Sequence, residues 1–132
     1  MPNNLELERL FDVNAIHADL AQGRWFKLTL CEQLANVGSE FDRAFRARRA
    51  GNTLRFENAF QRFLELINLT LSDPRWTFLR KREIARLKEN IVANLYGDVP
   101  NLDAIASLER YFYYFGVARS KMRDHLNAID AA

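Results

Sequence analysis

The sequence predicts an all-α fold: an up-and-down four-helix bundle with an additional N-terminal helical segment. Apolar residues recur at spacings of three and four over long stretches, the period of a helix with one buried face. Only five glycines and three prolines occur in 132 residues, which favours helices over a turn-rich β fold. Short stop signals separate the periodic stretches, at Gly23, Gly51-Asn52, Ser72-Asp73-Pro74 and Gly97-Asp98-Val99-Pro100.

We expect a single helical domain over residues 1–132, with an N-terminal arm over 1–24 and the bundle over 29–129. The arm is weakly helical in pattern, and its apolar residues share one face, at Leu10, Val13, Ile16 and Leu20. It is expected to pack on the bundle or on another subunit.

The first bundle helix is predicted to begin at a capping box. Thr29 and Glu32 have the spacing in which each side chain satisfies the backbone N–H of the other. Gly51 supplies the stop at the far end. Gly38 lies in the middle of this helix, where glycine costs roughly 1 kcal/mol relative to alanine. Close approach of a neighbouring helix explains it, and a kink is the alternative.

Three further helices follow. Asn52 or Thr53 is expected to begin the second, and Pro74, in the favoured first position, the third. Pro100-Asn101 is expected to open the last and longest helix. Because the connections are short, consecutive helices are predicted to be antiparallel neighbours.

Composition excludes several classes of protein. One cysteine gives no internal disulfide framework and no cysteine zinc site, and indicates a reducing cytoplasm. No apolar run approaches the length of a membrane span. Neither His17 nor His125 has a glutamate three residues before it, so the di-metal motif of helical bundles is absent. We therefore expect no metal, no cofactor and no membrane.

The net charge of +2 is distributed unevenly. Residues 40–90 carry twelve basic and seven acidic side chains. Two basic patches result, at opposite ends of the predicted bundle. The first patch consists of Arg43, Arg46, Arg48, Arg49 and Arg55, and the second of Arg75, Arg80, Lys81, Arg82 and Arg86. All of these except Arg48 and Arg86 are candidate residues for binding nucleic acid or an acidic partner. The plainer interpretation is a solvated helix surface of mixed charge.

Five consecutive aromatic residues, 111–115, form the densest cluster. Such a run wraps more than one helix face, so not all of the rings can enter one core. Tyrosine is enriched where a surface meets a partner, which makes Tyr111, Tyr114 and Phe115 candidate interface residues. A wide core beneath the arm is the alternative. A homo-oligomer, by default a dimer, or a separate protein partner fits the first interpretation.

Much of the chain resembles a set of small bacterial helical-bundle proteins of unassigned function. The resemblance covers about residues 28–119 and is carried by Leu34-Ala35-Asn36-Val37-Gly38-Ser39-Glu40, Asp73-Pro74-Arg75 and Tyr96-Gly97-Asp98. It implies a helical bundle and no particular activity. Most of its positions are caps, stops and core, but Asn36, Ser39 and Glu40 form a polar cluster. Glu40 and Arg43 have the spacing of an ion pair on one helix.

Arg119 and His125 form the sharpest local pattern. Their spacing resembles the arginine-to-histidine signature of HEPN domains, which are helical and often dimeric. The resemblance implies an RNA nuclease or toxin in which arginine stabilises phosphate charge and histidine transfers a proton. The sequence after His125 departs from the HEPN pattern. Our first hypothesis is therefore a non-enzymatic protein acting by self-association or partner binding, and the nuclease is the alternative.

Overall fold

The computed structural model describes residues 23–97 and 101–131, with side chains as far as residue 116. The predicted arm therefore lies almost entirely outside the described residues. The elements in chain order are a short 3-10 helix η2 (Trp25–Lys27) and four α-helices: α3 (Leu30–Arg49), α4 (Thr53–Ser72), α5 (Phe78–Tyr96) and α6 (Leu102–Ala131). No strand occurs within these residues. The all-α four-helix prediction is confirmed.

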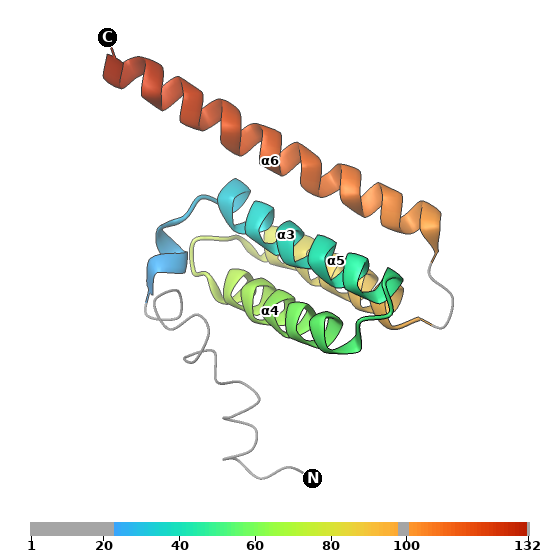
Figure 1. The fold of residues 1–132 in the computed structure, drawn as a ribbon. Coiled ribbons are helices and arrows are strands. Elements are labelled where there is room, and N and C mark those ends of the chain that lie inside the picture. The colour runs from blue at the N-terminus through green and yellow to red at the C-terminus, as the bar shows by residue number, and fades with distance from the viewer. Residues whose placement is uncertain (1–22, 98–100, 132) are drawn as a thin grey trace.

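The helices run alternately in opposite directions, and α3 packs against both α4 and α6 (Figure 1). The last turns of α6 extend beyond the end of α3 at which that helix begins (Figure 1). The core between the helices is rich in aromatic rings. Its largest buried members are Trp25, Phe41, Phe45, Phe56, Phe60, Phe63, Ile67, Ile84, Ile91, Leu95, Ile105, Leu108 and Phe112.

The predicted caps at both ends of α3 are confirmed. The Glu32 N–H donates to Thr29 Oγ1 at 3.2 Å, and the Thr29 N–H donates back to Glu32 Oε1 at 3.1 Å. At the other end Gly51 has φ +70°, a left-handed conformation that glycine adopts without steric cost. The Asn52 N–H then reaches back to the Ala47 carbonyl at 2.9 Å, which closes a Schellman motif.

The start of α5 differs from the prediction that Pro74 opens this helix. The helix begins at Phe78, and Thr77 is its cap, accepting from the Arg80 N–H at 3.3 Å. The reason is the side chain of Asp73, whose Oδ1 accepts the Arg75 N–H at 3.0 Å and holds the chain in a turn. Proline can precede a helix in such a turn as well as open one.

Of the two explanations for Gly38 that the sequence offers, the structure supports close approach of a neighbouring helix. A Cβ atom placed on Gly38 would lie 2.6 Å from the ring of Phe112 on α6. The ring of Phe112 also packs on that of Phe41, with centroids 5.6 Å apart. The missing side chain at Gly38 therefore sets the distance at which α6 lies on α3.

Arg48 links the end of α3 to the end of α5. Its guanidinium donates to the carbonyl of Asn94 at 3.0 Å and to the carbonyls of Leu95 and Gly97. These carbonyls belong to the last turn of α5 and to its cap, where a cation is favoured by the helix dipole. Arg48 is thus a cap for another helix and not a member of the surface patch.

Candidate interaction sites

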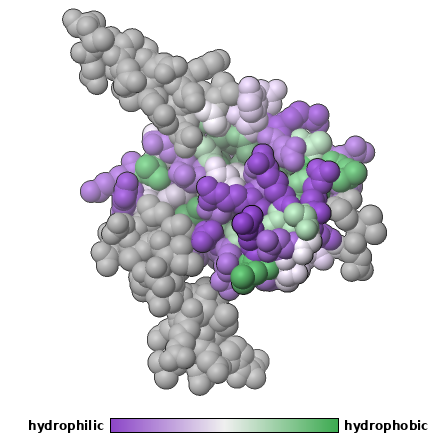
Figure 2. Space-filling model, viewed as in Figure 1, coloured by the Kyte–Doolittle hydropathy of each residue, from purple (hydrophilic) through white to green (hydrophobic). Residues whose placement is uncertain are grey.

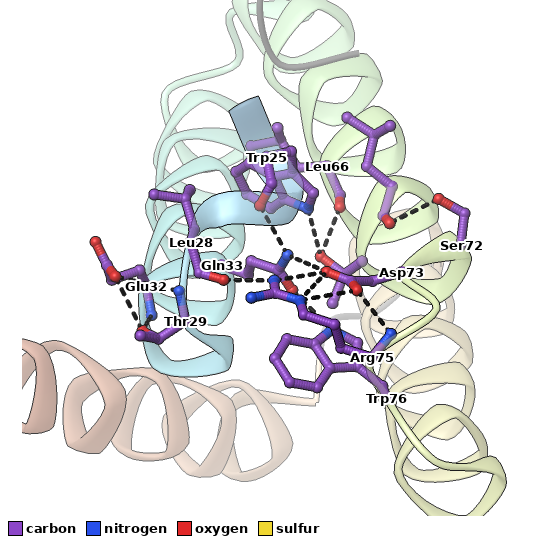
Figure 3. Close-up of polar contacts among 12 residues, drawn as sticks. Trp25, Leu28, Thr29, Glu32, Gln33, Leu66, Ser72, Asp73, Arg75 and Trp76 are labelled. Carbon is purple, nitrogen blue, oxygen red and sulfur yellow. Dashed lines mark hydrogen bonds and ion pairs between the residues drawn. The ribbon is translucent and has the colours of Figure 1, made fainter. Parts of the chain in front are cut away.

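A buried polar network joins η2, α3 and the turn between α4 and α5 (Figure 3). Gln33 is its centre and is completely buried. Its amide nitrogen donates to Asp73 Oδ2 at 2.9 Å and to the Trp25 carbonyl at 3.0 Å. Its amide oxygen accepts from the indole N–H of Trp76 at 2.9 Å. The three hydrogen bonds fix the side chain, and the indole of Trp25 donates to Thr70 Oγ1 in the same region at 3.2 Å.

Asp73 is a fully buried carboxylate, and Arg75 neutralises it. The guanidinium nitrogens of Arg75 donate to Asp73 Oδ1 at 3.0 Å and to Oδ2 at 2.7 Å. Chiefly because of these bonds, the pKa of Asp73 falls from 3.8 to about 2. Arg75 also donates to the Leu28 carbonyl and lies over the ring of Trp76. Arg75 therefore belongs to the packing of the fold more than to an open basic patch.

The rest of the second patch lies on the first turns of α5. Arg80 lies 3.8 Å from Glu83 on its own helix. Arg82 is exposed and Lys81 is partly buried. None of these three side chains lines either of the two hollows that are described below.

The first patch, in contrast, lies at an open hollow. Four arginines from two helices line this hollow, and three of them belong to the predicted patch. It lies between the last turns of α3 and the first half of α4 and has a volume of about 590 Å³. We call it the arginine groove. Its lining consists of Arg43, Arg46, Ala47, Ala50, Asn52, Arg55, Asn58, Ala59 and Arg62. The view in Figure 2 shows a largely hydrophilic surface on this side of the molecule.

The candidate residues of the first patch and the arginines of the groove differ by one residue in each direction. Arg49 does not line the arginine groove and lies 5.7 Å from the centre of the Phe45 ring. Arg62, on the other hand, lines the groove but was not among the predicted residues. Its spacing of seven from Arg55 places it two turns along the same face of α4, which is the sequence signal that identifies it.

The aromatic run on α6 divides between the protein interior and the surface. Phe112 is buried, and Tyr111 is half-buried with its ring against Phe112 and Phe115. Burial, and then the charge of Glu83, raises the pKa of Tyr111 to about 12. Tyr114 is 70% exposed, as is its neighbour Tyr113 at 69%.

A second hollow of about 250 Å³ lies between α3 and α6, and Tyr113 is part of its lining. We call it the α6 hollow. It is lined by Ala35, Gly38, Ser39, Phe41, Asp42, Glu109, Phe112, Tyr113 and Gly116. Its floor is apolar, since Phe41 and Phe112 are buried, and its acidic residues are Asp42 and Glu109.

The predicted polar cluster is bound within α3. Asn36 donates to the Glu32 carbonyl at 2.9 Å and Ser39 to the Ala35 carbonyl at 3.1 Å. Arg43 donates to Glu40 Oε1 at 2.9 Å, so the predicted ion pair is confirmed. These contacts distribute the three side chains along α3 and do not assemble them into a catalytic group.

The predicted nuclease residues lie beyond the described side chains. Arg119 and His125 both lie on the part of α6 beyond residue 116, where only the backbone is described. Their use in a shared site therefore stays a prediction. Among the described side chains, no group of three or more His, Cys, Asp or Glu is placed to hold a metal ion. In the same part of the chain, no helix is both long enough and apolar enough to cross a membrane.

Comparison with known proteins gave no matching family model, no matching curated protein and no matching solved structure.

Proposed function

We propose that this protein acts by binding and not by catalysis, and that its first partner is a second copy of itself, held through α6. One observation carries the proposal: two adjacent tyrosines, Tyr113 and Tyr114, are about 70% exposed on α6, and the first of them lines a hollow with an apolar floor. Soluble domains seldom leave several large aromatic rings exposed together without a partner.

A second copy is the occupant that suits this surface, because the surface carries both halves of the contact. In a two-fold dimer, a side chain that enters its partner's hollow is matched by the same side chain entering its own. The ring of Tyr114 would meet the apolar floor formed by Phe41 and Phe112. Its hydroxyl would donate to Asp42 or Glu109 at the rim.

The test is the mass of the protein by light scattering over a range of concentrations. We expect a dimer for the unmodified chain. Tyr114→Ala should weaken association by about 2 kcal/mol or more, roughly thirtyfold, as for a tyrosine central to an interface. Leu54→Ala is the matched control, because Leu54 is 72% exposed but lies on α4.

A second variant tests the hollow itself. Ser39→Trp fills the α6 hollow from an exposed position, so it should also give monomers while the helical circular dichroism is unchanged. An equimolar mixture of Ser39→Trp and Tyr114→Ala should regain part of the association, since one intact tyrosine can still enter one open hollow. An unmodified chain that stays monomeric, or equal weakening by Leu54→Ala, would overturn the proposal.

A further inference from the structure

The arginine groove lies apart from the α6 hollow, and its lining is built from two antiparallel helices. Arg43 and Arg46 come from the end of α3, and Arg55 and Arg62 come from α4. Arg55 and Arg62 are seven residues apart, so their Cα atoms are separated by about 10 Å along the helix. The groove therefore presents cations along its length and not at a single point.

The four arginines differ in whether an acidic side chain neutralises their charge. Arg43 pairs with Glu40, and Arg46 pairs with Asp42 at 3.1 Å. Arg55 and Arg62 have no ion pair within the described part of the chain. Among the described side chains, no aspartate or glutamate lines the groove itself. Its walls thus hold two uncompensated guanidinium groups and two whose charge is partly neutralised.

Guanidinium groups at this spacing favour an extended anion with more than one phosphate. Arginine binds phosphate oxygens through paired hydrogen bonds, which makes it the common residue for this ligand. The amide of Asn58 adds a neutral donor and acceptor suited to sugar hydroxyls, and Asn52, whose oxygen caps α4, adds its amide N–H donors. Ala47, Ala50 and Ala59 also line the groove, and their small side chains leave room for a chain to lie close to the helices.

The lining also indicates what the groove does not recognise. No aromatic ring is among the described residues that line it, and these therefore offer no surface on which bases could stack. Contacts to phosphate and sugar position a nucleic acid without reading its sequence. An open hollow between two neighbouring helices accepts one strand more readily than the full width of a duplex.

From these features we infer that the arginine groove binds the phosphate backbone of single-stranded nucleic acid, independently of sequence, with Arg55 and Arg62 as its principal contacts.

The experiment measures the fluorescence anisotropy of labelled oligo-uridine, oligo-deoxyuridine and oligo-thymidine, each of about 12 nucleotides, between about 50 and 200 mM salt. Arg55→Gln with Arg62→Gln should weaken binding by about tenfold or more at low salt. It should also reduce the slope of log affinity against log salt by about 1.4, since each lost contact to a single strand contributes about 0.7.

Arg82→Gln with Arg86→Gln is the matched control. Both residues are exposed on α5, outside the groove, and the pair removes the same net charge. This variant should bind nearly as the unmodified chain does. Circular dichroism of every variant confirms that the fold is kept.

Three results would overturn the inference: no binding by the unmodified chain, equal weakening by the two double variants, or tighter binding of a duplex of the same length. Tighter binding of oligo-uridine than of oligo-deoxyuridine, which lacks only the sugar hydroxyl, would support it and identify that hydroxyl as a contact. Light scattering on the same samples separates this result from self-association, because the groove variants should keep the mass of the unmodified chain.

Discussion

Asp73→Asn isolates the charge at the centre of the buried network. Asparagine keeps the shape of the side chain and an acceptor for Gln33, but it cannot neutralise Arg75. Because Asp73 is fully buried, its carboxylate gains little from solvent and depends on these two partners. The substitution should therefore destabilise the fold in a manner that depends on pH.

The magnitude follows from the pKa. The pKa of Asp73 is about 2 in the folded protein against 3.8 ordinarily, a difference of 1.8 units. At 1.36 kcal/mol per unit, this is about 2 kcal/mol of stability. The folded pKa is lowered, so the contribution is complete above about pH 4 and is lost as the pH falls through about 2. Above about pH 4, the Asp73→Asn variant should therefore be less stable than the unmodified protein by about 2 kcal/mol.

The assay is urea denaturation followed by circular dichroism, for both proteins, at several values between about pH 5 and pH 2. The difference between their free energies of unfolding should shrink by about 2 kcal/mol as the solution is acidified. Asp42→Asn is the control, because the exposed pair of Asp42 and Arg46 should contribute less than about 1 kcal/mol. A difference between wild type and Asp73→Asn that is constant with pH would refute the reasoning.

Three further predictions concern α5 and α6. Gly38→Ala should lower stability to urea, because crowding of Phe112 costs about 1–3 kcal/mol against roughly 1 kcal/mol gained in helix propensity; a more stable variant would contradict the close contact. Arg48→Ala uncaps α5, so hydrogen exchange in its last turn should accelerate about tenfold, and unchanged exchange would count against the cap. Tyr111→Phe should remove from an ultraviolet titration the component with a pKa of about 12; loss of a component near pH 10 would show that burial and Glu83 do not act as described.

The ends of helices could be predicted from the sequence because their signals are local. Thr29 and Glu32 satisfy each other's N–H groups across three residues, and Gly51 adopts its conformation whatever lies around it. Pro74 misled for the same reason. A proline after Asp73 is compatible with a helix start and with a turn, and the choice depended on a hydrogen bond from Arg75 that no periodicity reveals.

The buried network could not be predicted, because its partners are far apart in the chain. Gln33 and Asp73 are separated by 40 residues, and each is an ordinary polar residue in sequence. Arg48 was misread similarly: the sequence places it in a surface patch near the end of α3, but its guanidinium caps α5. In both cases the sequence predicts that a polar group is present, and only the packing decides what it satisfies.

The same distinction decides what a cluster of arginines means. By sequence alone Arg48, Arg55 and Arg75 look alike, as basic residues near helix ends. The fold engages the guanidinium of Arg48 with carbonyls and that of Arg75 with a buried carboxylate, while Arg55 faces an open groove. An arginine that already binds carbonyls or a carboxylate of the protein is a poor ligand site, because binding a ligand would leave those groups unpaired. The arginines to test first are therefore Arg55 and Arg62, which have no ion pair among the described residues.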